Sequence, residues 1–119
     1  MKVRALRGAT TVDADDAEAI TEATAELLTE MLGRNGVAPD DLISVVFTAT
    51  PDLTAGFPAA AARSLGLSDV PLLCAAEIAV PGAMARCIRV LMHVYTGADR
   101  AELRHVYLRD AEALRADLR

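Results

Sequence analysis

The chain has 119 residues, with 12 lysine and arginine side chains against 17 aspartates and glutamates, which gives a net charge of −5 at pH 7. This length fits a single domain, residues 1–119, and excludes a second one. The negative charge offers no electrostatic attraction to nucleic acid or to an anionic membrane, so we expect neither as a partner.

Hydrophobic residues make up 53% of the chain, but aromatic residues make up only 3%. The core must therefore be built from alanine, leucine, valine and isoleucine side chains, each of which buries a small area. Association with further copies would bury more apolar surface, so we expect an oligomer.

Cys74 and Cys87 are the two cysteines, and the first residues, MKVRALRGAT, contain no apolar segment for export. We therefore expect a reducing, cytoplasmic compartment in which both thiols are free. Glu77, Pro81 and Arg86 interrupt the most apolar stretch before it reaches the roughly 18 uninterrupted apolar residues of a membrane helix. The sequence thus predicts a soluble protein.

The first half of the chain alternates strand and helix patterns. Residues 2–12 mix valine, leucine and threonine with alternating arginines, which is typical of a strand. Asp16 and the aspartates just before it supply an N-cap, apolar residues then recur at helical spacing over residues 20–31, and Gly33 marks the end of this helix. Residues 42–50 form a β-branched run that predicts a strand buried on both faces.

The second half begins with a short helix and continues with strands. Proline is common at the first position of a helix and glycine just after its end. Pro58 and Gly66 therefore predict the two ends of a short alanine-rich helix. Strands are predicted for residues 70–78, 86–96 and 104–110. This order of elements predicts an α/β, or α+β-like, fold in which helices pack on one face of a mixed β-sheet.

Arg89 is the only full charge in the apolar run of residues 87–95. Period-two alternation places Ile88, Val90, Met92 and Val94 on one face, and Cys87, Arg89, Leu91, His93 and Tyr95 on the other. An arginine is almost never fully buried without a partner, because an unpaired buried charge is strongly destabilising. The position of Arg89 therefore needs an explanation.

Two interpretations of Arg89 are open. In the structural interpretation, Arg89 forms an ion pair with Glu77 or lies at a solvated sheet edge. In the functional interpretation, an anionic or electron-rich ligand completes its site. Arg7 repeats the pattern on the first strand, where it shares a face with Val3 and Ala5. Spacing alone does not distinguish the two interpretations.

Several ordered blocks of the sequence together resemble the short, monofunctional chorismate mutases of the α/β class. The blocks are Arg4-Ala-Leu-Arg-Gly-Ala-Thr-Thr11, Thr48-Ala-Thr-Pro-Asp-Leu53, Phe57-Pro-Ala59, Cys87-Ile-Arg-Val90 and Arg104-His-Val-Tyr-Leu108. The resemblance runs from the first strand to Leu114 and Arg115, which is essentially the whole chain.

The resemblance implies a homotrimer of pseudo-α/β-barrel appearance with active sites in the clefts between subunits. It also implies an isomerase that converts chorismate to prephenate in phenylalanine and tyrosine biosynthesis. The implied catalytic residues are Arg89, Glu77 and Arg7. The implied substrate-binding residues are Arg7, Leu73, Cys74, Ala75, Ala76, Glu77, Arg89, Tyr107, Phe57, Arg63, Leu114 and Arg115. Phe57 and Arg63 are expected from the neighbouring subunit.

This reaction is a unimolecular Claisen rearrangement without proton transfer or covalent intermediate, so no metal and no cofactor are expected. It requires that a flexible dicarboxylate be held in its diaxial conformer and that the partial negative charge on the ether oxygen be stabilised. The family pattern assigns Arg89 to the ether oxygen, Arg7 and Tyr107 to the carboxylates, and Glu77 to the ring hydroxyl and to the orientation of Arg89.

Three details of the resemblance are less regular. Strand alternation places Cys74 and Glu77 on opposite faces, so residues 75–76 must bulge or twist if both side chains line the site. Ala60 and Ala116 stand where relatives often have lysine and proline, which removes a cation from the mouth of the site and loosens the tail.

Two alternative functions belong to different classes. One is a trimeric module that binds a small carboxylate through Arg7 and Arg89 without turnover. The other is an imine-deaminase-like enzyme on a related fold, in which Glu77 would activate water. His93 and His105 have no partners at metal-ligand spacing and are interpreted as structural.

Overall fold

The computed structural model describes residues 1–118, with side chains described through residue 115. Along the chain the elements are β1 (Lys2–Thr11), α1 (Ala17–Arg34), η1 (Pro39–Asp41), β2 (Leu42–Ala49), α2 (Ala59–Ser64), β3 (Leu72–Ala76), β4 (Cys87–Thr96), η2 (Arg100–Glu102), β5 (Val106–Tyr107) and η3 (Arg109–Leu118). The η elements are 3₁₀ helices.

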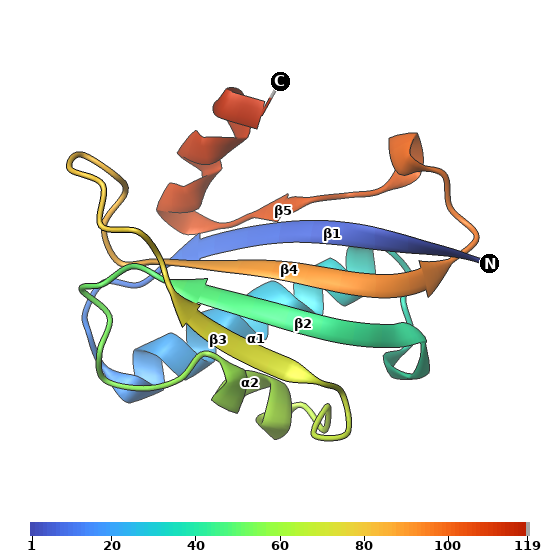
Figure 1. The fold of residues 1–119 in the computed structure, drawn as a ribbon, viewed down its shortest axis with the longest axis horizontal. Coiled ribbons are helices and arrows are strands. Elements are labelled where there is room, and N and C mark those ends of the chain that lie inside the picture. Colours follow the sequence, from blue (N-terminus) through green and yellow to red (C-terminus); the bar gives the residue numbers. More distant parts are fainter. Residues whose placement is uncertain (119) are drawn as a thin grey trace.

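The strands form one five-stranded sheet in the order β3-β2-β4-β1-β5. The pairs β2·β4 and β4·β1 are antiparallel, whereas β2·β3 and β1·β5 are parallel. Figure 1 shows α1 behind the sheet and α2 beside the edge strand β3, while the face toward the viewer carries no helix across its middle. Residues of α2 belong to the same core cluster as residues of α1, so both helices pack on one face. The prediction of a mixed sheet with helices on one face is confirmed.

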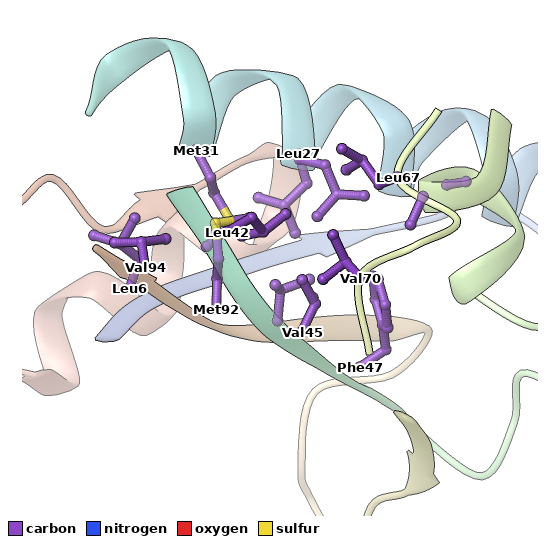
Figure 2. Close-up of a cluster of buried hydrophobic side chains, with 14 of the residues drawn as sticks. Leu6, Leu27, Met31, Leu42, Val45, Phe47, Leu67, Val70, Met92 and Val94 are labelled. Carbon is purple, nitrogen blue, oxygen red and sulfur yellow. The ribbon is translucent and has the colours of Figure 1, made fainter. Parts of the chain in front are cut away.

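The main core lies between the helices and the sheet. Figure 2 shows Leu27 and Met31 of α1 in the same cluster as Val45 of β2 and Met92 of β4, and all four side chains are fully buried. Because the chain has few aromatic residues, close packing of these non-aromatic apolar side chains supplies most of the hydrophobic stabilisation of the core.

The alternation predicted for β4 is confirmed over Ile88–Val94, where the even-numbered residues are buried in the core and Arg89 and Leu91 are exposed. Cys87, which the alternation places on the face of Arg89, is nevertheless fully buried. The expectation that residues 42–50 are buried on both faces is wrong within this chain. Val45 and Phe47 are fully buried, whereas Val46 and Thr48 are only half-buried. The reason is that no layer of the same chain covers the second face of the sheet there.

Gly8 allows β1 to approach α1 closely. A Cβ atom at this position would overlap the side chain of Met31, which is fully buried, and would crowd Leu27 as well. A glycine is therefore required on the core face of β1, directly beside Arg7, which points to the other face.

Two predicted strands are shorter in the structure. Residues 70–78 contribute only β3, because the Val70 N–H bonds the Leu67 carbonyl in a turn and Pro71 has no N–H to donate. Residues 104–110 contribute only β5, and Asn35 instead takes both backbone groups of Arg104, accepting its N–H and donating to its carbonyl.

The ends of the helices follow the sequence signals. The Asp16 side chain accepts from the Ala19 N–H at 3.0 Å and caps α1, as predicted. Gly66 follows α2 with a φ of 81°, the left-handed conformation in which glycine is favoured. Within residues 1–118, no helix has the length and apolar character needed to cross a membrane.

Candidate active site

A row of side chains crosses the open face of the sheet from one edge to the other. The strand register places Ala75 beside Thr48, Thr48 beside Arg89, Arg89 beside Ala9, and Ala9 beside Tyr107. Because paired residues in neighbouring strands share a face, these five residues lie on the face that the helices leave uncovered. Arg89 is thus held at the middle of the sheet on a central strand.

The row opens into a cavity of about 530 Å³. Its lining residues are Arg7, Gly8, Ala9, Val46, Thr48, Arg89, Val90, Leu91, Tyr107 and Leu114. Four residues predicted for the site, namely Arg7, Arg89, Tyr107 and Leu114, therefore come together. Ala9 lies between Arg89 and Tyr107 in the row, and its small side chain leaves the space open.

Glu77 is attached to this cavity through Arg89. The Glu77 Oε2 atom lies 3.2 Å from Arg89 Nε and also accepts from the Thr48 hydroxyl at 2.6 Å. The Arg89 side chain remains 45% exposed and that of Glu77 17% exposed. The Arg89 side chain also lines the cavity and keeps nearly half of its surface exposed, so part of the guanidinium is accessible to a ligand.

The ion pair between Arg89 and Glu77 agrees with the structural interpretation of Arg89, but it does not exclude the other one. The printed contact with Glu77 is made through Nε, and a guanidinium carries further donors of the kind that bind oxyanions in other proteins. One contact thus leaves Arg89 both anchored and able to bind.

Arg7 is positioned through its backbone. Its N–H donates to His105 Nδ1 at 3.0 Å, which requires that this nitrogen carry no proton. Burial, followed by the positive charge of Arg7, lowers the pKa of His105 and keeps the imidazole neutral. The Arg7 guanidinium itself has no partner within the described part of the chain.

Tyr107 brings a second kind of donor. Its side chain lines the cavity, and its hydroxyl oxygen is buried without a hydrogen-bond partner among the described residues. An unsatisfied buried hydroxyl is costly, typically about 1–3 kcal/mol, unless a ligand or water completes it. Tyr107 therefore places a polar group with unused hydrogen-bonding capacity at the wall of this cavity.

The turn before β4 is fixed by a carboxylate. Asp52 accepts from the Thr50 hydroxyl and, at 2.9 Å, from the Arg86 N–H, while the Arg86 side chain donates to the Val12 carbonyl. Arg86 has a φ of 47°, a conformation that non-glycine residues adopt only when held there. The Thr50 hydroxyl bond, above all, lowers the pKa of Asp52. This network sets where the strand that carries Arg89 begins.

A second cavity, of about 520 Å³, lies on the loop that follows β2 and at the end of β3. Its lining includes Phe57, Cys74, Ala75 and Ala76, and Phe57 is 71% exposed. The Asp15 carboxylate holds this loop by accepting from both the hydroxyl and the N–H of Thr54 and from the next N–H, which lowers the pKa of Asp15.

Cys74 lies with Phe57 and not with Arg89. The register of β3 on β2 is continuous, so Cys74 shares the core face with Phe47, and Glu77 is on the opposite face with Thr48. No bulge brings the two side chains of one chain together. Within a single chain, therefore, Cys74 does not join Arg7, Arg89 and Tyr107 in the cavity.

The other predicted residues lie outside both cavities. Leu73 is exposed on the open face of β3, Arg63 is exposed on α2, and Arg115 is exposed on η3. Ala60 is half-buried in α2, whereas the side chain of Ala116 lies outside the described residues.

Sequence reasoning missed Thr48 and Val46 as lining residues. Both stand on β2, and neither has an unusual residue type that would draw attention in an apolar strand. Alternation opposite the buried Phe47 would have placed them on the open face. What it could not show is that β2 pairs with β4 in the register that sets Thr48 against Arg89.

Comparison with known proteins agrees with this geometry. Residues 3–118 match the family model described as chorismate mutase type I. The chorismate mutase AroH of Thermus thermophilus is 52% identical over 117 residues, which is 98% of this chain and 96% of that protein. The chorismate mutase AroH of Bacillus subtilis (strain 168) is 44% identical over 119 residues, which is 99% of this chain and 94% of that protein.

A solved structure shows the same fold. A chorismate mutase from Clostridium thermocellum superimposes with a TM-score of 0.92 at 50% sequence identity, covering 93% of this chain and 99% of that one. Agreement of this extent in both sequence and structure confirms the resemblance inferred from the motifs. The chain therefore belongs to the type I chorismate mutase family.

Proposed function

We propose that this chorismate mutase converts chorismate to prephenate in the cavity formed by Arg7, Arg89 and Tyr107, and that residues 1–119 form one catalytic domain. The observation that carries the proposal is the Arg89–Glu77 contact, in which Nε lies 3.2 Å from the carboxylate while the half-exposed Arg89 side chain lines the cavity. The two free cysteines agree with a reducing, cytoplasmic location.

The rearrangement breaks the ether C–O bond and forms a C–C bond within the same molecule, so no group is gained or lost. Negative charge grows on the ether oxygen as its bond breaks. The Nη donors of Arg89 stabilise that charge, and they require no rearrangement because Glu77 already holds the guanidinium in place. This stabilisation is greater in the transition state than in the bound substrate, because the charge on the ether oxygen is greatest there.

The substrate is a dicarboxylate, and the cavity carries matching donors. Arg7 and the Tyr107 hydroxyl bind the carboxylates and hold the reactive diaxial conformer. Two guanidinium groups against the single carboxylate of Glu77 leave the site with a net positive charge, which favours an anion. Glu77 also accepts from the ring hydroxyl, and it is not a general base because no proton moves.

We propose that the functional unit is a homotrimer with active sites between subunits. Support comes from large hydrophobic side chains that one chain leaves exposed on its open sheet face and in the loop before β4. They are Val3, Leu73, Leu91 and Tyr95 on the sheet, and Ile78 and Val80 in the loop. Such a patch marks an interface in soluble proteins.

The two separate cavities support shared sites. In this assembly, Phe57, Arg63 and Cys74 of one subunit complete the Arg7–Arg89–Tyr107 cavity of the next. This arrangement removes the conflict created by alternation, because Cys74 and Glu77 then come from different chains and no bulge is needed. Leu114 and Arg115 on η3 close over the same site.

The activity is tested by mixing the purified protein with chorismate and following its loss together with the appearance of prephenate. A decay no faster than in buffer would refute the proposal. The family match to chorismate mutases over nearly the whole chain weighs against both a binding module without turnover and an imine deaminase.

Shared sites are tested by mixing inactive chains. Arg89→Ala and Arg63→Ala alter opposite halves of the proposed site. In trimers mixed at random from equal amounts of the two chains, about a quarter of all sites should therefore combine two unaltered halves and be active. The matched control mixes Arg89→Ala with Arg7→Ala, which alter the same half and should recover none. Equal recovery in the two mixtures, or none in the first after mixed trimers are verified, would count against shared sites.

A further inference from the structure

Thr48 lies on β2, between the strand that carries Arg89 and the strand that leads to Glu77. The strand register sets Thr48 beside Arg89, and both line the same cavity. The Thr48 hydroxyl bonds Glu77, which follows β3 on the other side of β2 from Arg89, so Thr48 connects the three strands that carry this part of the site.

The contact is short and its donor is defined. The Thr48 hydroxyl donates to Glu77 Oε2 at 2.6 Å, and the same oxygen lies 3.2 Å from Arg89 Nε. A carboxylate has no proton to donate, so the threonine must be the donor. Hydrogen bonds to a charged acceptor are about twice as strong as neutral ones.

The hydroxyl limits the rotamers open to the carboxylate. Glu77 follows the last residue of β3, and its side chain has several rotatable bonds, so the Arg89 contact alone would leave the carboxylate more freedom to rotate. With both Thr48 and Arg89 at Oε2, the carboxylate is held from two strands.

We propose that Thr48 is a positioning residue for the rearrangement: its hydroxyl orients Glu77, and Glu77 in turn aims the guanidinium of Arg89. This inference rests on the proposed function of the site. Thr48 acts through another residue, so its removal affects the geometry on which transition-state stabilisation depends more than it affects substrate binding.

The test is Thr48→Val, which keeps the shape and removes the hydroxyl. We expect kcat to fall about tenfold to a hundredfold, with KM changed much less. Thr48→Ser restores the donor and should recover most of kcat. On a Glu77→Ala background, Thr48→Val should cause little further loss, because the group through which it acts is gone.

Ser44→Ala is the matched control. Ser44 also lies on β2, and its hydroxyl is 3.3 Å from His93 Nδ1, away from Arg89. The Ser44→Ala variant should keep kcat near the wild-type value. Thermal unfolding should show that Thr48→Val is folded to the same extent as Ser44→Ala.

Three results would overturn the role of Thr48: unchanged kcat in Thr48→Val, no recovery in Thr48→Ser, or an equal loss on the Glu77→Ala background. The proposed function has a separate criterion, because it stands if the wild-type protein converts chorismate faster than buffer does. A fully active Glu77→Ala variant would refute the roles of Glu77 and Thr48 but not the conversion of chorismate.

Discussion

The two faces of β4 differ in almost every property although they alternate along the same ten residues. Ile88, Met92 and Val94 are completely buried against α1 and the neighbouring strands, whereas Arg89 and Leu91 point to the open face. The core face is uniformly apolar and sealed by the helices. The open face carries the charged group that faces the cavity.

This difference separates stability from chemistry. Arg89 keeps 45% of its side chain exposed, so it avoids most of the desolvation cost that a buried guanidinium would carry. The side chains that stabilise the strand lie on the other face and cannot reach a ligand. A substitution on one face should therefore change one property and leave the other largely intact.

The largest effect should come from Met92→Ala on the core face. Met92 is fully buried between α1 and the sheet (Figure 2), and its truncation leaves a cavity. We expect the free energy of unfolding to fall by about 2–5 kcal/mol. Urea unfolding at a fixed protein concentration measures this loss, and kcat per folded molecule should stay near the wild-type value. A loss of kcat without a loss of stability would contradict the claim that the core face of β4 governs stability and the open face governs activity.

Arg89→Lys on the open face should produce the opposite pattern. The charge is kept, but the planar fork that spans Glu77 and the cavity is lost. Removal of one preorganised donor costs about 2.7–4 kcal/mol in other enzymes, so kcat should fall by about 10²–10³. Steady-state kinetics with chorismate measure this effect, and thermal unfolding should show little change. Near-full activity would refute the role given to Arg89.

Asp52→Asn should have the smallest effect, a loss of stability that depends on pH. Asp52 has a lowered pKa in the folded state, mainly because it accepts from the Thr50 hydroxyl, so its ionised form stabilises the turn before β4. That contribution is present above the unfolded pKa of about 3.9 and is lost as the pH falls through the folded value.

Wild type should thus be more stable than Asp52→Asn at neutral pH, and the gap should close as the pH falls below about 4. Unfolding midpoints measured across this range test the expectation. A gap that stays constant down to the lowest pH would show that the charge of Asp52 does not contribute.

Local patterns predicted the elements whose signals are contained within a few residues. The cap at Asp16, the glycine after α2 and the alternation along β4 all depend on backbone geometry and on the contrast between apolar and polar side chains. They did not predict where β5 begins, because Asn35, far away in the chain, takes the backbone groups of Arg104 that a longer strand would have used.

The candidate site divides in the same way. Arg7, Arg89 and Glu77 drew attention as charges within apolar strands, and the motifs assigned them together to one family site. The placement of Cys74 beside Phe57 and the contact of Thr48 with Glu77 were not visible, since both depend on how β3 pairs with β2.

The sequence by itself determined that a charged group must stand on one face of a strand that is otherwise apolar, because side chains alternate with a period of two whatever the rest of the fold does. Only the tertiary structure decided what meets that group. Strand order and register are set by packing over the whole sheet, and they bring Thr48, Ala9 and Tyr107 into one row with Arg89 from four separate strands.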